Sequence, residues 1–256
     1  MTEIALARPS STVVLIREAA AAPEILMVRR HARLSFGASY AFPGGVLDDS
    51  DHRVHDRCSG ISAVDADRLL HVDGNGLDYL SAAIRELFEE TGVMLAQTEL
   101  DDDEKQVARQ QLNDGLLSWD ELLQTKNLKL ACDSLHYFGY WMTPICQPKR
   151  YSTRFFAAEL PDGQKAVHDG AELTDSFWMT AGEVLETNRD ERMSLPFPTT
   201  KTLESIAVHD SVAKILEWAK TCVAVGVHCK LPKVIEENGK KRIVLPEQDE
   251  HKGAGG

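Results

Sequence analysis

The chain has 256 residues, of which 40 are acidic and 28 basic, so its formal net charge is −12. Hydrophobic residues make up 43% of it, a fraction that is ordinary for a globular protein and argues against global disorder. The excess of acid argues against a general nucleic-acid binder, which needs basic surface to neutralise phosphates. A small phosphate-bearing substrate stays open, because a metal ion can reverse the local sign of a site.

The sequence contains no membrane or secretion signal. No apolar run approaches the ~20 residues of a membrane helix, and residues 1–10 lack the basic and apolar segments of a secretory leader. Five scattered cysteines without a CxxC pair indicate free thiols in a reducing cytosol. The histidines form no HExxH or other spaced pair. These features predict a cytoplasmic protein.

The first part of the chain predicts a hairpin, a tight loop and a long helix. Apolar runs at 12–16 and 25–28, separated by a short turn, predict two antiparallel strands. Phe42-Pro43-Gly44-Gly45 predicts a tight loop. The polar stretch 48–76 predicts an inserted surface segment, outside the core, with a short helix at 63–70. The clearest helix is predicted over 77–96, with Gly92 near its end.

The second part of the chain mixes strands and helices without strict alternation. The patterns predict helices at 101–114, 119–125, 181–188, 199–209 and 212–225, and strands at 135–142, 154–160 and 176–179. Asn238-Gly239, between two extended segments at 234–237 and 240–245, predicts a terminal hairpin. The fold class is therefore α+β, with a mixed sheet and helices packed on it.

The most informative segment is Arg85 to Val93. Each helical residue advances by about 100°, so Glu86, Glu89 and Glu90 lie on one face, and Arg85 can reach Glu89 four residues later. A hard divalent cation, Mg²⁺ or Mn²⁺, would offset the repulsion of the carboxylates and bind substrate phosphates as well. The alternative is a solvated acidic face. The nearby Gly-Gly loop favours the metal site, because glycines let backbone approach a metal or phosphate closely.

Together these segments resemble the Nudix hydrolases. The box of that family runs Gly, five residues, Glu, seven residues, then Arg-Glu-apolar-x-Glu-Glu-x-Gly-apolar; residues 85–93 match its second half, and Gly45 is similar to its first glycine. The resemblance implies an α/β/α sandwich and a divalent metal held by Glu86, Glu89, Glu90 and the Gly44 carbonyl. It also implies that the three glutamates are the catalytic residues, without separating which one acts as base.

The box is interrupted in this chain. Residues 46–84 separate Gly45 from Arg85, which is 39 residues where the family has thirteen, an insertion of 26. The glutamate of the first half is absent from its usual place, and Asp48, Asp49 or Asp51 could substitute. A box opened here resembles the coenzyme A diphosphatase branch of the family. Further parts that look like that branch are Arg30, Arg33-Leu34-Ser35-Phe36-Gly37, Tyr40 to Gly45, Trp141-Met142-Thr143-Pro144 and Arg154-Phe155-Phe156.

Several other residues are candidates for binding. Arg30, Arg33 and Arg154, with Gly45 and Arg85, could hold substrate phosphates, although ordinary surface arginine is the alternative for any single one. Glu172 is either an extra metal ligand or base, or a plain loop residue. Three aromatic residues either stack on an adenine or belong to the core; they are Tyr40, Trp141 and Phe155.

These observations predict a metal-dependent hydrolase of pyrophosphate bonds, with coenzyme A or acyl-CoA as the expected substrate. The alternatives are ADP-ribose, NADH or a dinucleotide, or a Nudix-like domain that binds a ligand without hydrolysis. We expect a Nudix domain over 1–198, with an insertion at 46–76, and a helical extension with a hairpin over 199–256, packed on the same domain. The expected partner is a small diphosphate, neither a nucleic-acid polymer nor a membrane, and a homodimer is left open.

Overall fold

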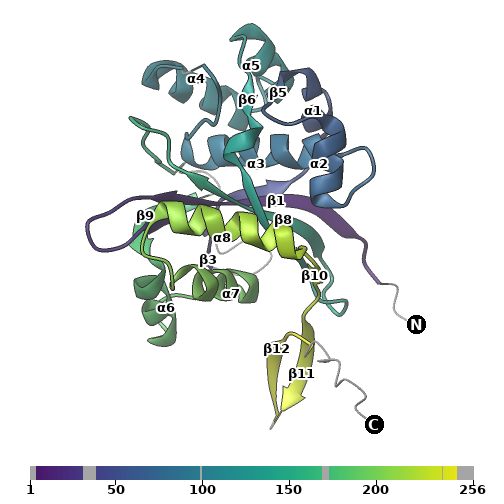
Figure 1. Ribbon diagram of the computed structural model, residues 1–256, viewed down its shortest axis with the longest axis vertical. Helices are drawn as coiled ribbons and strands as arrows, with labels where there is room; N and C mark the ends of the chain where they lie inside the picture. Colours follow the sequence, from purple (N-terminus) through teal and green to yellow (C-terminus); the bar gives the residue numbers. More distant parts are fainter. Residues whose placement is uncertain (1–3, 31–38, 99, 169–172, 238, 247–256) are drawn as a thin grey trace.

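A computed structural model describes residues 4–30, 39–98, 100–168, 173–237 and 239–246. Its centre is an eight-stranded mixed sheet (Figure 1). Strand β1 (Ala7–Arg17) runs parallel to β8 (Arg150–Glu159) and antiparallel to β2 (Glu24–Arg30) and β4 (Gly44–Val46). Ile16 lies opposite Ile25, which confirms the predicted hairpin.

The remaining strands extend this sheet on both sides. β7 (His136–Met142) is antiparallel to β8, and β10 (Cys229–Lys230) is parallel to β7. β9 (Leu173–Thr180) and β3 (Tyr40–Ala41) both pair with β2. Parallel and antiparallel pairs coexist, so the mixed sheet of the predicted α+β class is confirmed.

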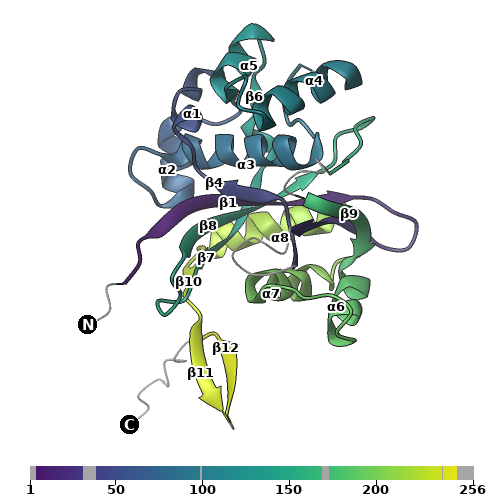
Figure 2. The ribbon, with the colours of Figure 1, turned by 180° about the vertical axis from the view of Figure 1, so that it is seen from behind.

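Helices cover both faces of the sheet, as the two ribbon views show (Figures 1 and 2). One face carries α1 (Asp49–His52), α2 (Ala63–Leu70), α3 (Gly76–Thr91), α4 (Asp102–Asn113) and α5 (Trp119–Thr125). On this side lie also η1 (His55–Arg57), η2 (Cys132–Ser134) and the parallel pair β5 (Cys58–Ser59) and β6 (Leu130–Ala131). The other face carries α6 (Ala181–Arg189), α7 (Phe197–Ile206) and α8 (Val212–Val225). No described helix is long and apolar enough to cross a bilayer.

The sheet separates two hydrophobic cores. Successive side chains of a strand point to opposite faces, so Val13 and Leu15 of β1 enter the core beneath α3, whereas Val14 and Ile16 enter the core beneath α8. All four are fully buried. This explains why residues 13–16 are continuously apolar, as is usual for a strand that is covered on both faces.

The inserted segment contributes to the first core. Val54, Ala66 and Leu70 are at most 1% exposed and belong to the same cluster as Leu80 and Leu87 of α3. The prediction that 48–76 is a surface segment outside the core was therefore wrong. Most residues of this segment are polar, so the apolar face of α2 is not evident from composition. That face packs against α3.

Helix α3 ends earlier than predicted. Gly92 follows its last residue with φ of 75°, a left-handed conformation that favours glycine, and its N–H donates to the carbonyl of Phe88 at 2.8 Å. The helix expected over 77–96 thus stops at Thr91, since a glycine in this conformation ends the helix where its last turn is closed.

The C-terminal elements follow the predicted order. α7 and α8 pack on the sheet through buried residues such as Leu203, Ile206 and Ile215. The predicted hairpin is formed by β11 (Lys233–Glu237) and β12 (Lys240–Val244), which projects from the body of the molecule (Figure 1). The division of the chain at residue 198 stays a prediction.

Candidate active site

The last two turns of α3 face Gly44 and Gly45, the first two residues of β4. The backbone N–H of Gly44 donates to a carboxylate oxygen of Glu90 at 2.9 Å, in a buried position. At Gly45, a Cβ atom would lie only 2.4 Å from the carboxylate of Glu86, so this position has no room for a side chain. The structure therefore brings the two glycines and the predicted glutamates together. The prediction of a tight loop was wrong for Gly44 and Gly45, because both pair with β1 as part of strand β4.

Arg85 holds the glutamates in place. One terminal nitrogen donates to Glu86 at 3.0 Å and to Glu89 at 3.1 Å. The other donates to the Val46 carbonyl at 2.9 Å and to Asp51 at 3.0 Å, and Nε donates to Asp51 at 3.1 Å. These bonds use all five N–H donors of a guanidinium. The predicted contact with Glu89 is confirmed, but Arg85 has no donor left for a substrate phosphate, which makes it a positioning residue.

Asp51 links the insertion to this centre. It lies on α1, its side chain is fully buried, and it also accepts a hydrogen bond from the Ser81 hydroxyl at 2.9 Å. Of the three aspartates proposed to replace the missing glutamate, Asp51 is the one that bonds to Arg85. Its role is to fix the guanidinium that orients Glu86 and Glu89.

The carboxylates are close enough to disturb one another's ionisation. Burial raises the pKa of Glu89 to about 7; Arg85 opposes this shift, and the negative charge of Glu86 adds to it. A metal-free protein thus holds less than its full formal charge here near neutral pH. A bound divalent cation would favour the ionised form.

The donor set fits a hard divalent cation. It is made of carboxylate oxygens from Glu86, Glu89 and Glu90, and Mg²⁺ and Mn²⁺ prefer oxygen ligands. The bare backbone at Gly45 borders the Glu86 carboxylate where a Cβ atom would otherwise intrude. The residues and the space between them therefore agree with the metal site implied by the resemblance.

Arg109 is a part of this centre that the sequence did not indicate. Its guanidinium, from α4, donates to the backbone carbonyls of Glu89 at 2.7 Å and Glu90 at 2.5 Å. These carbonyls belong to the last turn of α3, which has no donors of its own for them within the helix. Arg109 follows Glu89 by 20 residues and Glu90 by 19, so the contact depends on how α4 is placed and cannot be read from the sequence.

Arg154 is not brought to the glutamates. Its buried guanidinium donates to the Leu70 carbonyl at 3.2 Å and lies 3.5 Å from the centroid of the Tyr140 ring. These contacts place it beside the end of α2. Arg33 and Glu172 lie outside the described residues, and so does the side chain of Arg30, whose backbone ends β2.

The predicted aromatic residues belong to the core on the other side of the sheet. Trp141 and Phe155 are about 5% exposed, and Tyr40 packs against the same cluster. This confirms the core interpretation and separates these rings from the face that carries α3.

A pocket of about 420 Å³ is lined by Glu89, one of the three glutamates. The insertion provides Asp48, Ser50 and Arg53, and α3 provides Arg85 and Glu89. The facing wall is formed by residues of α4, of α5 and of the connection between them: Leu112, Gly115, Leu116, Leu117, Ser118, Trp119 and Glu121. This volume is within the range of small-molecule sites.

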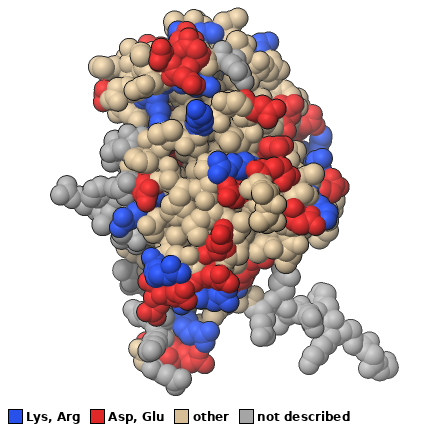
Figure 3. Space-filling model, turned by 90° about the vertical axis from the view of Figure 1, so that its left-hand side faces the viewer, with Lys and Arg blue, Asp and Glu red and all other residues tan. Residues whose placement is uncertain are grey.

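On the face shown in Figure 3, the basic side chains of the described residues lie among acidic ones and form no continuous basic patch. A nucleic-acid polymer would require such a patch. The distribution of charge on this face therefore agrees with the prediction of a small-molecule partner.

Comparison with known proteins now decides the family. The model of the NUDT19 Nudix domain matches residues 72–205, just over half of the chain, and this range includes the whole of α3. The chain belongs to this Nudix family. The sequence prediction of a Nudix domain is thereby confirmed, whereas its assignment to the coenzyme A branch is a finer statement that this match does not address.

Two relatives illustrate the membership. A Caenorhabditis elegans protein named "Putative nudix hydrolase 7" is 22% identical over 188 residues, which are 72% of this chain and 55% of that protein. The chain thus spans about half the length of this curated relative. The crystal structure of a Nudix hydrolase from Alicyclobacillus acidocaldarius has 26% identity and a TM-score of 0.70, covering 82% of this chain and 96% of that one. The predicted Nudix fold is confirmed.

Proposed function

We propose that this Nudix domain hydrolyses a pyrophosphate bond in a substrate built on a nucleoside diphosphate, in a reaction that depends on Mg²⁺ or Mn²⁺. The observation that carries the proposal is the approach of Glu86 and Glu90 to the Gly44-Gly45 backbone, with Arg85 fixing Glu86 and Glu89. A merely solvated acidic face would not need a buried arginine to hold its carboxylates.

Glu86, Glu89, Glu90 and the Gly44 carbonyl would hold the metal. When bound, such an ion polarises phosphoryl oxygens and lowers the pKa of a coordinated water. One of the three glutamates accepts the proton of the attacking water. Gly45, Arg30 and Arg33 remain proposals for binding the phosphates at the glutamates, and Glu172 for an extra ligand or base. Arg154, which bonds to Leu70 beside α2, could reach only a more distant part of the substrate.

Coenzyme A or an acyl-CoA is the substrate that we propose. The support is the sequence signature around Arg33 to Gly45 and the insertion inside the box. The insertion also supplies Asp48, Ser50 and Arg53 to the pocket beside Glu89, so it is placed to influence which substrate binds. A cytoplasmic location and a homodimer remain predictions.

A substrate panel tests this proposal. The purified chain is stripped with a chelator and assayed with coenzyme A, acetyl-CoA, ADP-ribose, NADH and a dinucleoside polyphosphate, with and without Mg²⁺. Mass spectrometry identifies the products. We expect Mg²⁺-dependent cleavage of coenzyme A into 3′,5′-ADP and 4′-phosphopantetheine, faster than cleavage of the other substrates. Equal rates on all of them would overturn the coenzyme A preference.

Two variants complete the test. Glu90→Gln keeps an oxygen that accepts from the Gly44 N–H but loses the charge, and turnover should be lost. The control, Glu104→Gln, removes an exposed carboxylate of α4 and should keep wild-type rates. If the wild type shows no metal-dependent turnover on any diphosphate but still binds one, the chain is a sensor and the hydrolase proposal is wrong.

A further inference from the structure

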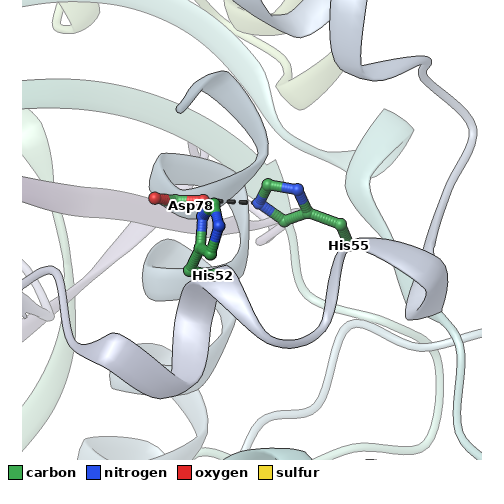
Figure 4. A group of neighbouring side chains, drawn as sticks. All are labelled: His52, His55 and Asp78. Carbon is green, nitrogen blue, oxygen red and sulfur yellow. Dashed lines mark hydrogen bonds and ion pairs between the residues drawn. The ribbon is translucent and has the colours of Figure 1, made fainter. Parts of the chain in front are cut away.

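A second cluster of metal-binding side chains lies at the other end of α3 (Figure 4). It consists of His52 from α1, His55 from η1 and Asp78 from the first turn of α3. Nδ1 of His52 lies 3.3 Å from Oδ1 of Asp78, and Nε2 of His55 lies 2.5 Å from the same oxygen. One ligand atom from each residue lies within 4.8 Å of the other two. The prediction that the histidines form no spaced pair was wrong, because His52 and His55 lie three residues apart and their rings meet.

The local fold explains why these side chains meet. His52 is the last residue of α1 and His55 the first of η1, so a change of helix type turns two residues three apart toward the same point. Their rings meet edge to face, with centroids 4.8 Å apart. The N-terminal turn of α3 brings Asp78 to that point from a distant part of the chain.

The cluster is anchored on one side and open to solvent on the other. The side chain of Asp78 is 15% exposed and that of His55 29%, whereas that of His52 is 68% exposed. A cation can therefore reach the cluster from the side of His52. The buried side holds the carboxylate in a fixed position.

Neighbouring cations are directed elsewhere. Arg53 hydrogen-bonds to Asp120 of α5, and Arg57 hydrogen-bonds to Asn127. Among the residues that the structure describes, the ion pairs of Asp78 are those with the two histidines. The local chemistry is thus two imidazoles converging on one carboxylate, without an arginine that competes for it.

We propose that His52, His55 and Asp78 bind a divalent first-row transition metal of the Zn²⁺ type. Imidazole nitrogen suits Zn²⁺, Cu²⁺ and Ni²⁺ better than it suits Mg²⁺. Metal–ligand distances of ~2.0–2.1 Å in a tetrahedral site separate the ligand atoms by roughly 3.3–3.5 Å. The His52–Asp78 distance of 3.3 Å already has this value, and the shorter His55–Asp78 distance would open by about 1 Å to admit the metal. Water takes the fourth position.

The metal would clamp the insertion onto α3. His52 directly follows Asp51 in α1, and Asp51 bonds to the arginine that orients Glu86 and Glu89. A cation shared by α1, η1 and α3 fixes this segment at a second point. The site is separate from the carboxylate centre and does not depend on hydrolytic activity.

Zinc competition is the experiment. The chelator-stripped chain is titrated with Zn²⁺ against a chromophoric chelator in excess Mg²⁺, which occupies oxygen-only sites. We expect one tight equivalent per chain, weakened at least about 100-fold in His55→Gln and in Asp78→Asn. Substitution with Co²⁺ should give visible tetrahedral bands without a thiolate charge-transfer band, which excludes binding by the cysteines.

Matched variants distinguish this cluster from the other groups of the chain that could bind Zn²⁺. His71→Asn changes an exposed histidine of the same insertion, at a left-handed position that asparagine also adopts, and should bind Zn²⁺ like the wild type. Glu89→Gln should do so as well. Absence of a tight equivalent in the wild type, or unchanged affinity in both His55→Gln and Asp78→Asn, would overturn the proposal.

A measurement on the wild type avoids dependence on variants that fold poorly. Imidazole resonances of two histidines should shift in an NMR spectrum upon addition of one equivalent of Zn²⁺. The same shifts in the His71→Asn variant would show that neither resonance belongs to His71. Zinc binding that leaves all histidine resonances unchanged would place the metal elsewhere and would contradict the proposal.

Discussion

The two ends of α3 carry acidic side chains that face the same insertion, but they differ in how they are built. At the C-terminal end, Glu86, Glu89 and Glu90 come from one helix, and two of them, Glu86 and Glu90, meet backbone at Gly45 and Gly44. At the N-terminal end, Asp78 meets two histidines from other elements. The first centre offers oxygen ligands only, and the second offers mainly nitrogen.

With the two sites proposed above, this difference would let one helix serve two kinds of cation. Oxygen ligands suit Mg²⁺ and Mn²⁺, whereas imidazole selects transition metals. Helix α1 connects the two centres, because it carries both His52 and Asp51. The insertion interrupts the family box, but through Asp51 it also supports the arginine that orients Glu86 and Glu89.

Loss of one carboxylate charge should have the largest effect. We expect Glu86→Gln to lower kcat at saturating Mg²⁺ by about 1,000-fold or more, because in the proposed centre its charge would hold the metal, and it also pairs with Arg85. Steady-state kinetics on the best substrate of the panel provide the measurement, with Glu104→Gln as control. A loss under about tenfold would mean that Glu86 is not part of the reacting centre.

The link between insertion and helix should have the next largest effect. Arg85→Ala leaves Asp51 buried without its partner, and we expect it to lower the free energy of unfolding by about 3–5 kcal/mol. Asp51→Asn combined with Arg85→Ala should recover part of that loss. Urea denaturation of both single variants and the double variant measures the coupling. Strictly additive losses would show that the pair does not connect the two segments.

A methyl group at Gly45 should disturb the centre more gently. The added Cβ would lie 2.4 Å from the Glu86 carboxylate, so Gly45→Ala should displace that group and lower kcat by about 10- to 100-fold. Gly182→Ala is the matched control, because a Cβ at that position on α6 meets no atom within 4 Å. Equal activity of the two variants would argue against close approach of Gly45 and the carboxylate.

The wall that the insertion gives to the pocket should have the smallest effect. Arg53 lines the pocket but contacts none of the three glutamates in the described bonds, so Arg53→Gln should raise KM by about 3- to 10-fold with little change in kcat. Arg68→Gln, on the exposed side of α2, is the control. A large loss of kcat with unchanged KM would place Arg53 in the chemistry instead.

Local patterns predicted much of the fold and the helix of the centre. The 3.6-residue period placed Ile84, Leu87 and Phe88 in the core and the three glutamates on the opposite side. Spacing within one helix is fixed by backbone geometry, so it can be predicted without knowledge of the rest of the chain. The bounds of α5 and α8 followed for the same reason.

Contacts between distant segments could not be predicted in this way. Asp51 and Arg85 are 34 residues apart, and nothing in the local pattern selects Asp51 over Asp48 or Asp49. The meeting of Asp78 with His52 and His55 likewise depends on the path of the insertion. Strand β8 begins at Arg150, earlier than predicted, because its parallel pairing with β1 recruits half-exposed polar residues that lack an apolar pattern.

The Mg²⁺ requirement of hydrolysis tests most directly whether the three glutamates form the metal centre. Chelator-stripped wild type and Glu89→Gln are titrated with Mg²⁺ while product formation from the best diphosphate substrate is followed. We predict no turnover without metal, full recovery in the wild type, and at least about a tenfold higher Mg²⁺ requirement in Glu89→Gln. Metal-independent turnover, or the same Mg²⁺ requirement in both proteins, would contradict this role of the α3 glutamates.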